Sequence, residues 1–465
     1  MRIRRYFCRI SLVTLLAIGK GLLWAGDPSI APTPPMGWNS WDSYGQTITE
    51  AQVKANADWM AKHLKKFGWQ YIVIDEGWYV QNLGGDPKEF RFQLTDNGRF
   101  MPVPARFPSA ANNAGFKPLA DYVHSLGLKF GLHIIRGIPR EAVAKNMPIA
   151  DSAFHATDAA DPSDACPWNI YNWGVKANAA GQAYYDSIVK LYAGWGVDFI
   201  KADCIADHPY KPEEIRMLSK AIRKSGRKMV LSLSPGPTAL EHADEVAKYA
   251  EMWRISDDFW DHWGPWEKHE WSQGLFQQFA STAKWAPHSK PGGWPDADML
   301  PIGHLGPHPG EGEVRDTMLP KDEQRTLVTL WVIFRSPLMI GGDLLSMDEY
   351  TTSLLTNPEV IEVNQHSLGS RAEFSTDKAA VWRANKLATD CSPRYLAVFN
   401  ISDAEQSIHY EWKELGLKEC GGKKSSGKAL RYGLRDLWDH KKIGIAPSLE
   451  VKLAPHASVL YQLTE

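Results

Sequence analysis

The chain has 465 residues, of which 44% are hydrophobic and 23% charged, and its formal net charge at pH 7 is −2. A chain of this length is expected to fold into roughly two or three domains with apolar cores. The near-neutral charge argues against nucleic acid as the principal partner, which would call for a basic face. Twenty tryptophans are present. Because Trp packs in cores and also stacks on ligands such as sugars, those beside carboxylates are of most interest.

Residues 1–25 are typical of a secretory signal peptide. Arg2, Arg4 and Arg5 form a basic start, an apolar run follows, and Ala25 supplies a small residue for cleavage. The apolar run is too short for a transmembrane helix, and no later segment is apolar for long enough to span a bilayer. The sequence therefore predicts an exported protein, periplasmic or extracellular, with no membrane insertion after the signal peptide is removed.

Residues 26–367 alternate short apolar runs with helical patterns. In TEAQVKANADWMAKHLKKFG, Thr49 and Gln52 predict a capping box and Gly68 a C-cap. Strands that alternate with helices indicate parallel βαβ units, and about 340 residues of such units fit a (β/α)8 TIM barrel. No glycine-rich nucleotide motif follows the first strand. The predicted strands are YIVID (71–75), LKFGLHII (128–135), VDFIKAD (197–203), MVLSLS (229–234), MWRIS (252–256) and LMIGG (338–342).

Residues 368–465 change to short β-rich runs, which predict a C-terminal antiparallel β-sandwich domain. The runs are AAVWRAN, YLAVFNIS, SIHYEW, LRDLWD, LEVKL and ASVLYQL. No loop of this region collects several aromatic residues. We therefore expect the sandwich to support the barrel, with sugar binding as the alternative.

Four cysteines follow the signal peptide: Cys166, Cys204, Cys391 and Cys420. An even number in an exported protein permits two disulfides, but four cysteines allow three pairings. No CxxC or HExxH motif is present, and the two histidines of the loop IGHLGPHPG (302–310) fit an ordinary surface loop better than a metal site. We predict no metal.

Charged residues stand at the ends of several predicted strands, although charge is rarely buried without a partner. The stretch DFIKADC, for example, is an apolar run that ends in Lys201 and Asp203. Because the C-terminal ends of the strands form the active site of a TIM barrel, these charges are expected to meet at one mouth. One such charge is most simply a structural ion pair, but a whole set is harder to explain in that way. The others are Asp75, Glu76, Arg254, Asp258 and Asp298, with Trp41, Trp78, Trp253 and Trp294 near them in the sequence.

Two carboxylates among tryptophans suit glycoside hydrolysis. One carboxylate attacks the anomeric carbon or activates water, and the other protonates the leaving oxygen. The two need environments that separate their pKa values. Asp203, beside Lys201 in the sequence, is expected to stay ionised and to act as nucleophile. Asp258, followed by Phe259 and Trp260, is expected to be kept protonated and to act as acid.

Six ordered motifs resemble those of glycoside hydrolase family 27, the melibiase-type enzymes whose best-known members are α-galactosidases. They are PPMGWNSWDSYG, YIVIDEGW, WGVDFIKADC, MWRISDDFWD, GGWPDADML and RSPLMIGGDL. The resemblance implies a (β/α)8 barrel followed by a β-sandwich, and a retaining double displacement through a covalent glycosyl-enzyme with no cofactor. It places the nucleophile on Asp203 and the acid/base on Asp258, because the spacing from Arg254 selects Asp258 over Asp257. The substrate-binding residues that it implies are Trp41, Asp75, Glu76, Lys201, Arg254 and Asp298.

The chain departs from the family pattern at positions that bear on the sugar. Family members usually carry two aspartates where this chain has Asp75 and Glu76, and often tyrosine in place of His133. Ser234 and Pro235 stand where many members have larger residues that screen the sugar's 2-position. The extra methylene of the glutamate fits β-L-arabinopyranose, which is galactose-like in its ring but lacks the hydroxymethyl group. A backbone shift that absorbs the methylene is the alternative, and it would leave an ordinary α-galactosidase.

The sequence does not decide how the cysteines pair. The family resemblance implies a bond between Cys166 and Cys204, but the family usually places one residue between the nucleophile and this cysteine, and here the two are adjacent. Whether Cys391 and Cys420 form a second disulfide is likewise open.

The leading hypothesis is an exported retaining exo-glycosidase that removes terminal α-D-galactosyl residues from a galactosyl-type oligosaccharide or polysaccharide. A β-L-arabinopyranosidase and an α-N-acetylgalactosaminidase are the alternatives on the same scaffold. A catalytically silent carbohydrate-binding protein is the alternative from another class, and the presence of both Asp203 and Asp258 argues against it. The sequence does not give the oligomeric state.

Overall fold

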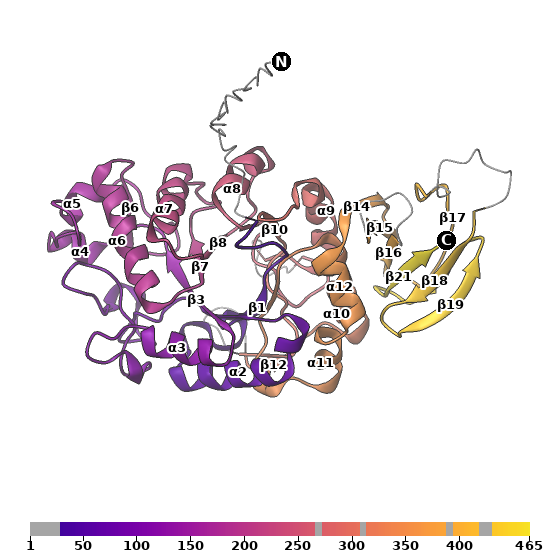
Figure 1. Cartoon of the computed structure of the whole chain (residues 1–465), viewed down its shortest axis with the longest axis horizontal. Helices are drawn as coiled ribbons and strands as arrows, with labels where there is room; N and C mark the ends of the chain where they lie inside the picture. Colours follow the sequence, from indigo (N-terminus) through magenta and orange to yellow (C-terminus); the bar gives the residue numbers. More distant parts are fainter. Residues whose placement is uncertain (1–27, 266–271, 307–312, 387–393, 418–429) are drawn as a thin grey trace, which may run out of the picture.

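The computed structural model describes residues 28–265, 272–306, 313–386, 394–417 and 430–465. The predicted signal peptide and the Cys391 and Cys420 pair lie outside the described residues. Figure 1 shows a barrel of helices and strands with a smaller β-domain beside it. Of the helices in the described ranges, none is long and apolar enough to cross a membrane.

Eight parallel strands form the wall of a (β/α)8 barrel. They are β1 (Met36–Asn39), β2 (Tyr71–Ile74), β3 (Lys129–Ile135), β7 (Phe199–Asp203), β8 (Val230–Leu233), β9 (Met252–Arg254), β10 (Trp294–Asp296) and β13 (Leu338–Ile340). Their spatial order is β10-β9-β8-β7-β3-β2-β1-β13, and each neighbouring pair is parallel. A parallel bridge between Leu300, just after β10, and Ile340 of β13 closes the ring.

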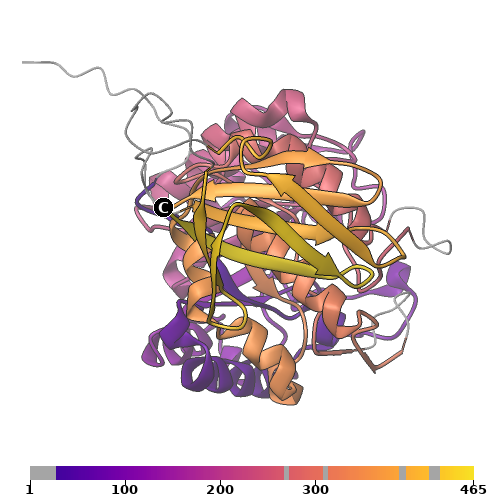
Figure 2. The same cartoon turned by 90° about the vertical axis from the view of Figure 1, so that its right-hand side faces the viewer.

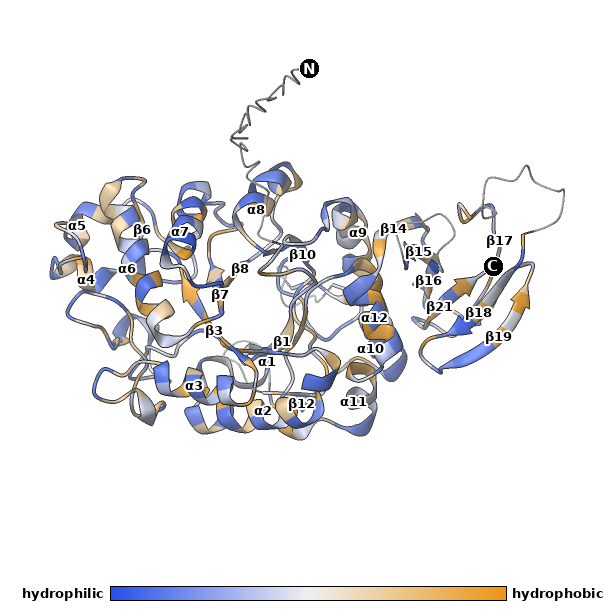
Figure 3. Ribbon diagram, viewed as in Figure 1, coloured by the Kyte–Doolittle hydropathy of each residue, from blue (hydrophilic) through white to orange (hydrophobic). Residues whose placement is uncertain are grey.

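A helix follows each barrel strand and covers the outside of the ring. The helices are α2 (Glu50–His63), α3 (Lys117–Ser125), α6 (Ala179–Trp195), α7 (Pro212–Ser225), α8 (Ala243–Tyr249), α9 (Leu275–Trp285), α10 (Lys321–Phe334) and α12 (Pro358–His366). Hydrophilic and hydrophobic residues lie side by side on helices such as α2 (Figure 3), as expected of helices with one buried face.

The connection between β3 and α6 carries small elements of its own. They are β4 (Ile138–Pro139), α4 (Arg140–Ala144), α5 (Ala156–Ala159), β5 (Ala160–Asp161) and β6 (Asn172–Val175), and the three strands pair in the order β4-β6-β5. Elsewhere the barrel carries α1 (Trp41–Tyr44), β11 (His304–Leu305), β12 (Arg315–Asp316) and α11 (Glu349–Leu355).

The C-terminal domain is an antiparallel β-sandwich. Its strands are β14 (Leu368–Ser375), β15 (Ala379–Asn385), β16 (Arg394–Asn400), β17 (Gln406–Glu411), β18 (Tyr432–Asp436), β19 (Lys441–Ala446), β20 (Ser448–Leu453) and β21 (Ser458–Thr464). Six of them form one sheet, β14-β15-β16-β21-β18-β19, and β17 pairs with β20. Figure 2 shows the larger sheet in front of the barrel. Because side chains alternate along a strand, Trp382 and Phe399 join the barrel core while Val381 and Val398 face the sandwich core.

The predicted fold class is confirmed, and all six predicted barrel strands are present. β10 was not among the six predicted strands: it contains Pro295, which has no N–H for the ladder and is untypical of a central strand. The capping box of Thr49 and Gln52 is confirmed. The expected C-cap is wrong for α2, which ends at His63. Gly68, at φ 100°, instead ends a short 3-10 helix that follows α2.

Candidate active site

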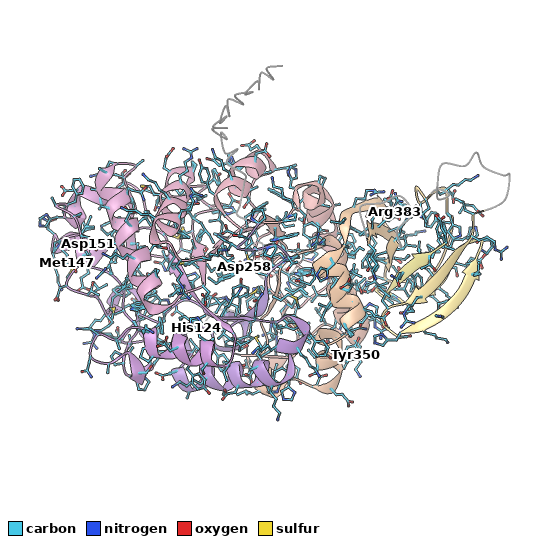
Figure 4. All side chains as sticks on the ribbon, in the orientation of Figure 1. His124, Met147, Asp151, Asp258, Tyr350 and Arg383 are labelled. Atoms are coloured by element: carbon cyan, nitrogen blue, oxygen red, sulfur yellow. A yellow bond between two sulfur atoms is a disulfide. The ribbon has the colours of Figure 1, made fainter. Side chains whose placement is uncertain are left out.

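The charged residues predicted at strand ends lie at the C-terminal end of the barrel. Asp75 and Glu76 follow β2, Asp203 ends β7 and Arg254 ends β9. Asp258 lies in the loop after β9, and in Figure 4 it appears near the middle of the ring of helices. Parallel strands of a closed barrel all end at the same rim, so residues that are far apart in the chain converge here. A cavity inside the barrel is lined by Asn39, Lys201, Ser234, Arg254 and Asp298, among others.

Asp75 and Lys201 form an ion pair between β2 and β7. The Nζ atom of Lys201 lies 2.8 Å from Oδ2 of Asp75, and Asn39 donates to the same oxygen at 2.7 Å. Asp75 is 2% exposed. Burial acts to raise the pKa of Asp75, but the charges of Lys201 and His133 hold that pKa well below its usual range. The pair therefore stays charged and rigid inside the barrel.

Asp203 has His133 as its closest charged partner. Nε2 of His133 lies 3.2 Å from Oδ2, while the Ser234 hydroxyl at 3.2 Å and the Cys204 N–H at 2.6 Å donate to Oδ1. Burial acts to raise the pKa of Asp203, but the hydrogen bond and charge of His133, followed by the charge of Lys201, hold that pKa below its usual value. Asp203 is thus kept ionised as expected, although Lys201 is not its direct partner because it is paired with another carboxylate.

Arg254 joins two carboxylates of different exposure. Its Nη2 atom lies 2.7 Å from Oδ2 of Asp298 and 3.1 Å from Oδ1 of Asp258. The Asp298 side chain is 5% exposed and also accepts the Phe259 N–H at 2.8 Å, whereas the Asp258 side chain is 47% exposed. Arg254 and Asp298 therefore form a buried pair, and Asp258 stands at the opening, where water and a leaving group have access.

The aromatic residues after Asp258 do not surround its carboxylate. Phe259 and Trp260 are only 2% and 3% exposed and pack into the protein, and Trp263 stacks on a residue of the sandwich. The apolar surroundings expected for the Asp258 carboxyl are therefore not formed, because its side chain is 47% exposed. The loop buries its aromatic side chains and leaves this carboxylate beside Arg254.

Only one of the four tryptophans noted near the charges is accessible. Trp78, Trp253 and Trp294 are 0% exposed and belong to the core, so these three side chains offer no surface to a ligand. Trp41, which begins α1 shortly after β1, is half-buried, and its backbone N–H donates to Oδ1 of Asn39 at 2.8 Å. Among these four, Trp41 is the one that a sugar could contact.

Glu76 is held by Asn169, a residue that the sequence did not identify. Nδ2 of Asn169 donates to Oε1 of Glu76 at 2.8 Å, and Oδ1 of Asn169 accepts the Tyr171 N–H at 3.0 Å. Burial raises the pKa of Glu76 to about 7; the charge of His133 opposes this rise and that of Asp203 adds to it. Near neutral pH this carboxyl group therefore exists in both protonation states.

A disulfide joins Cys166, in the loop between β5 and β6, to Cys204, the residue after Asp203. The pairing that the sequence left open is thus present.

Within the described ranges, no group of three or more His, Cys, Asp or Glu side chains is arranged to hold a metal ion. Two residues that contact the site were not predicted from the sequence, Asn39 and Asn169. Asn39 lies in the family-like motif PPMGWNSWDSYG, which could have pointed to it, whereas Asn169 is marked only by its closeness to Cys166. His133 and Ser234, which also contact the site residues, had been noted only as departures from the family pattern.

Comparisons with known proteins find matches for both domains of the chain. The family described as α-galactosidase A matches residues 33–142 and 170–366, and the α-galactosidase C-terminal β-sandwich domain matches 376–463. The α-galactosidase of Oryza sativa subsp. japonica is 28% identical over 95% of this chain and 87% of its own. A β-L-arabinopyranosidase structure from Geobacillus stearothermophilus is 45% identical, with a TM-score of 0.86 over 94% of this chain and 98% of that chain. The chain therefore belongs to the α-galactosidase family, glycoside hydrolase family 27, and is a glycoside hydrolase.

Proposed function

We propose that this glycoside hydrolase is a retaining exo-glycosidase for galactose-configured pyranosides and that it prefers β-L-arabinopyranosides. The observation that carries the choice of sugar is Glu76, which stands where the family usually has aspartate and is held through Oε1 by Asn169. β-L-Arabinopyranose has the ring stereochemistry of galactose without the hydroxymethyl group, so the longer acid fills space that galactose needs. The 45% identical arabinopyranosidase supports this choice, and a variant of that enzyme was solved in complex with arabinose.

In the proposed reaction, Asp203 attacks the anomeric carbon while Asp258 protonates the leaving oxygen. The ionised Asp258 then removes a proton from the water that hydrolyses the glycosyl-enzyme. The contacts of Asp203 with His133 and Ser234 support the role of nucleophile, because they keep the carboxylate ionised and fix its direction. The exposure of Asp258 supports contact with a leaving group. Fixed charges for the sugar hydroxyls come from Asp75, Lys201, Arg254 and Asp298, and a face for the ring comes from Trp41.

An α-D-galactosidase is the second candidate. The curated relatives from Oryza sativa and Cyamopsis tetragonoloba, at 28% and 29% identity over 95% of this chain, are α-galactosidases. Two relatives at this identity cover the barrel and the sandwich alike, so they favour the same chemistry with a hexose in place of the pentose.

A panel of aryl glycosides tests the proposal. We expect kcat/KM to be highest for the β-L-arabinopyranoside, lower for the α-D-galactopyranoside and lowest for the α-N-acetylgalactosaminide. Glu76→Asp should lower the ratio of kcat/KM for the arabinopyranoside to kcat/KM for the galactopyranoside by about 10–200-fold, the discrimination that one methylene gives. An unchanged ratio would show that Glu76 does not select the sugar.

Stereochemistry tests the mechanism separately. NMR of the first product should show the anomeric configuration of the substrate, and in a sugar complex the carboxyls of Asp203 and Asp258 should lie about 5–5.5 Å apart. Inversion, or a separation of about 6.5–9.5 Å, would overturn the retaining mechanism.

We also propose that the protein is exported. The basic and apolar start of the chain supports this. Mass spectrometry of the mature protein should find an N-terminus near Ala25, and a protein that keeps Met1 in the cell would contradict export.

A further inference from the structure

We propose that Asn169 is a positioning residue that sets the sugar preference by fixing the carboxyl group of Glu76. This inference rests on the proposed function, in which Glu76 contacts the sugar. Asn169 acts through Glu76 and not on the sugar itself.

The orientation of the Asn169 amide follows from its two partners. The Tyr171 N–H can only donate, so the Asn169 atom 3.0 Å away from it is the oxygen Oδ1. Nδ2 is then the atom that faces Glu76 and donates to Oε1 at 2.8 Å. Asn169 is 4% exposed, and a buried amide keeps the orientation that satisfies both ends. Oε1 of Glu76 is thereby occupied, and Oε2 is the oxygen left for a sugar hydroxyl.

The backbone around Asn169 is anchored on both sides. Three residues before it, Cys166 is bonded to Cys204 at the end of β7. Three residues after it, Asn172 of β6 donates to the carbonyl of Arg136 at 3.0 Å, and β6 pairs with β4. Asn169 is therefore tied to the ends of β7 and β3, so its amide is a fixed point from which Glu76 can be held.

Asn169 itself lies just outside the segments that match the family pattern. The α-galactosidase A family matches residues 33–142 and 170–366, and Asn169 lies in the stretch between them. The chain thus combines a glutamate, where the family usually has aspartate, with a partner that holds this glutamate. A glutamate has one more rotatable bond than an aspartate, and a hydrogen bond that fixes it offsets the loss of side-chain freedom on sugar binding.

Loss of the Asn169 amide should therefore change selectivity more than it changes overall activity. Without the hydrogen bond, the Glu76 carboxyl group can swing out of the space that a hydroxymethyl group would occupy. The galactoside is then accepted more readily, and the arabinopyranoside loses a preorganised contact. A general loosening of the loop would instead lower both rates together.

The experiment measures kcat/KM for the aryl β-L-arabinopyranoside and the aryl α-D-galactopyranoside in four proteins: wild type, Asn169→Ala, Glu76→Asp and the double variant. We expect Asn169→Ala to lower the arabinopyranoside-to-galactoside ratio of kcat/KM about 10-fold, the low end of the discrimination that one methylene of Glu76 gives. The double variant should have the ratio of Glu76→Asp alone, because a shortened acid no longer depends on Asn169. Ile170→Ala, which removes a neighbouring exposed side chain of the same loop, is the matched control and should keep the wild-type ratio.

Asn169→Asp is an isosteric second variant that keeps the acceptor for the Tyr171 N–H. It places two carboxyls at hydrogen-bond distance, and such a pair holds together only while it shares a proton. We expect its ratio to approach that of wild type at low pH and to fall as the pH rises, whereas the ratio of Asn169→Ala stays low at every pH. The other titratable groups facing Glu76, which both proteins retain, are Asp75, Tyr79, His133, Tyr171, Lys201 and Asp203.

An unchanged ratio in Asn169→Ala, or a pH-independent ratio in Asn169→Asp, would overturn the inference whichever sugar the wild type prefers. The wild-type preference is a separate result. An enzyme that prefers the galactoside would contradict the proposed sugar, and the change of ratio in the variants would still decide the role of Asn169.

Discussion

The imidazole of His456 stacks on the indole of Trp263, with ring centroids 3.7 Å apart and planes at 9°. His456 lies in the turn before β21 of the sandwich, and Trp263 lies in the loop after β9 that carries Asp258. Nδ1 of His456 is 2.6 Å from Glu323 of α10, and Nε2 is 3.0 Å from Asp403. The sandwich therefore contacts the loop of the expected acid directly.

Removing this contact should impair protonation of the leaving group. We expect His456→Ala to lower kcat/KM about 10-fold for a glycoside with a poor leaving group, because the loop with Asp258 loses its support and general acid catalysis contributes about 10²–10⁴-fold. His456→Phe keeps a ring on Trp263 and should retain most of the activity. Steady-state kinetics with a poor and an activated leaving group check both variants. Wild-type rates in His456→Ala would show that the sandwich does not position the loop.

Loss of the Asp203 carboxylate and loss of the Asp258 carboxylate should affect the rates differently. Asp203→Asn removes the proposed nucleophile and should lower kcat by roughly 10⁴-fold or more on every substrate. Asp258→Asn should cost about 10²–10⁴-fold with poor leaving groups and far less with activated aryl groups, which need little protonation. The dependence of kcat/KM on leaving-group pKa is the measurement. If Asp257→Asn shows this dependence and Asp258→Asn does not, the acid is one residue earlier in the chain.

Arg136 holds the end of β7 through a buried network. Its Nε donates to the Cys204 carbonyl at 2.6 Å, and its guanidinium pairs with Asp164 at 2.9 Å and Glu214 at 2.8 Å. Removal of one partner from a buried charge network costs about 3–5 kcal/mol, so Arg136→Met should lower the free energy of unfolding by that amount. Urea denaturation measures it. Addition of Glu214→Gln should recover part of the loss, and no recovery would mean that the unpaired charge is not the cause.

The disulfide should stabilise the chain measurably. Cys166 and Cys204 are 38 residues apart in the sequence, and a loop of this size corresponds to about 4 kcal/mol of loop-closure entropy in the unfolded chain. We expect the free energy of unfolding of the double variant Cys166→Ser and Cys204→Ser to be lower by that amount, which lowers the urea concentration at its unfolding midpoint. A reducing agent should have the same effect on the wild type and none on the variant. Equal midpoints for the two proteins would contradict the prediction.

His133 should make stability depend on pH above neutrality. Burial acts to lower the pKa of His133, but Asp75 and Asp203 raise it above its usual value. A histidine whose folded pKa is raised contributes stability that is complete below about pH 6.5 and is lost as the pH rises through the folded pKa. The melting temperature of wild type should therefore fall more between about pH 6.5 and 8.5 than that of His133→Gln, which cannot titrate. Parallel curves would mean that folding does not raise the pKa of His133.

The sequence was informative where the deciding forces are local. Apolar runs, several of which end in charge as the run before Lys201 and Asp203 does, identified six of the eight barrel strands, because burial and strand geometry depend on residues close together in the chain. Helix starts such as Thr49 follow from capping chemistry within one turn. The six motifs and the β-rich C-terminal region were enough to predict the barrel, the sandwich and the family.

The pairing of side chains was decided only by the tertiary structure. Lys201 pairs with Asp75, 126 positions away, because β2 and β7 both end at the rim of the closed barrel, and no local pattern encodes that meeting. Asn169 reaches Glu76 across 93 positions through a loop that a disulfide fixes in place. Asp258 is half-exposed because the aromatic residues after it find partners elsewhere in the fold. Local sequence determined which chemical groups arrive at the barrel mouth, and long-range packing decided which of them touch, because contact energies depend on distances that only the closed fold sets.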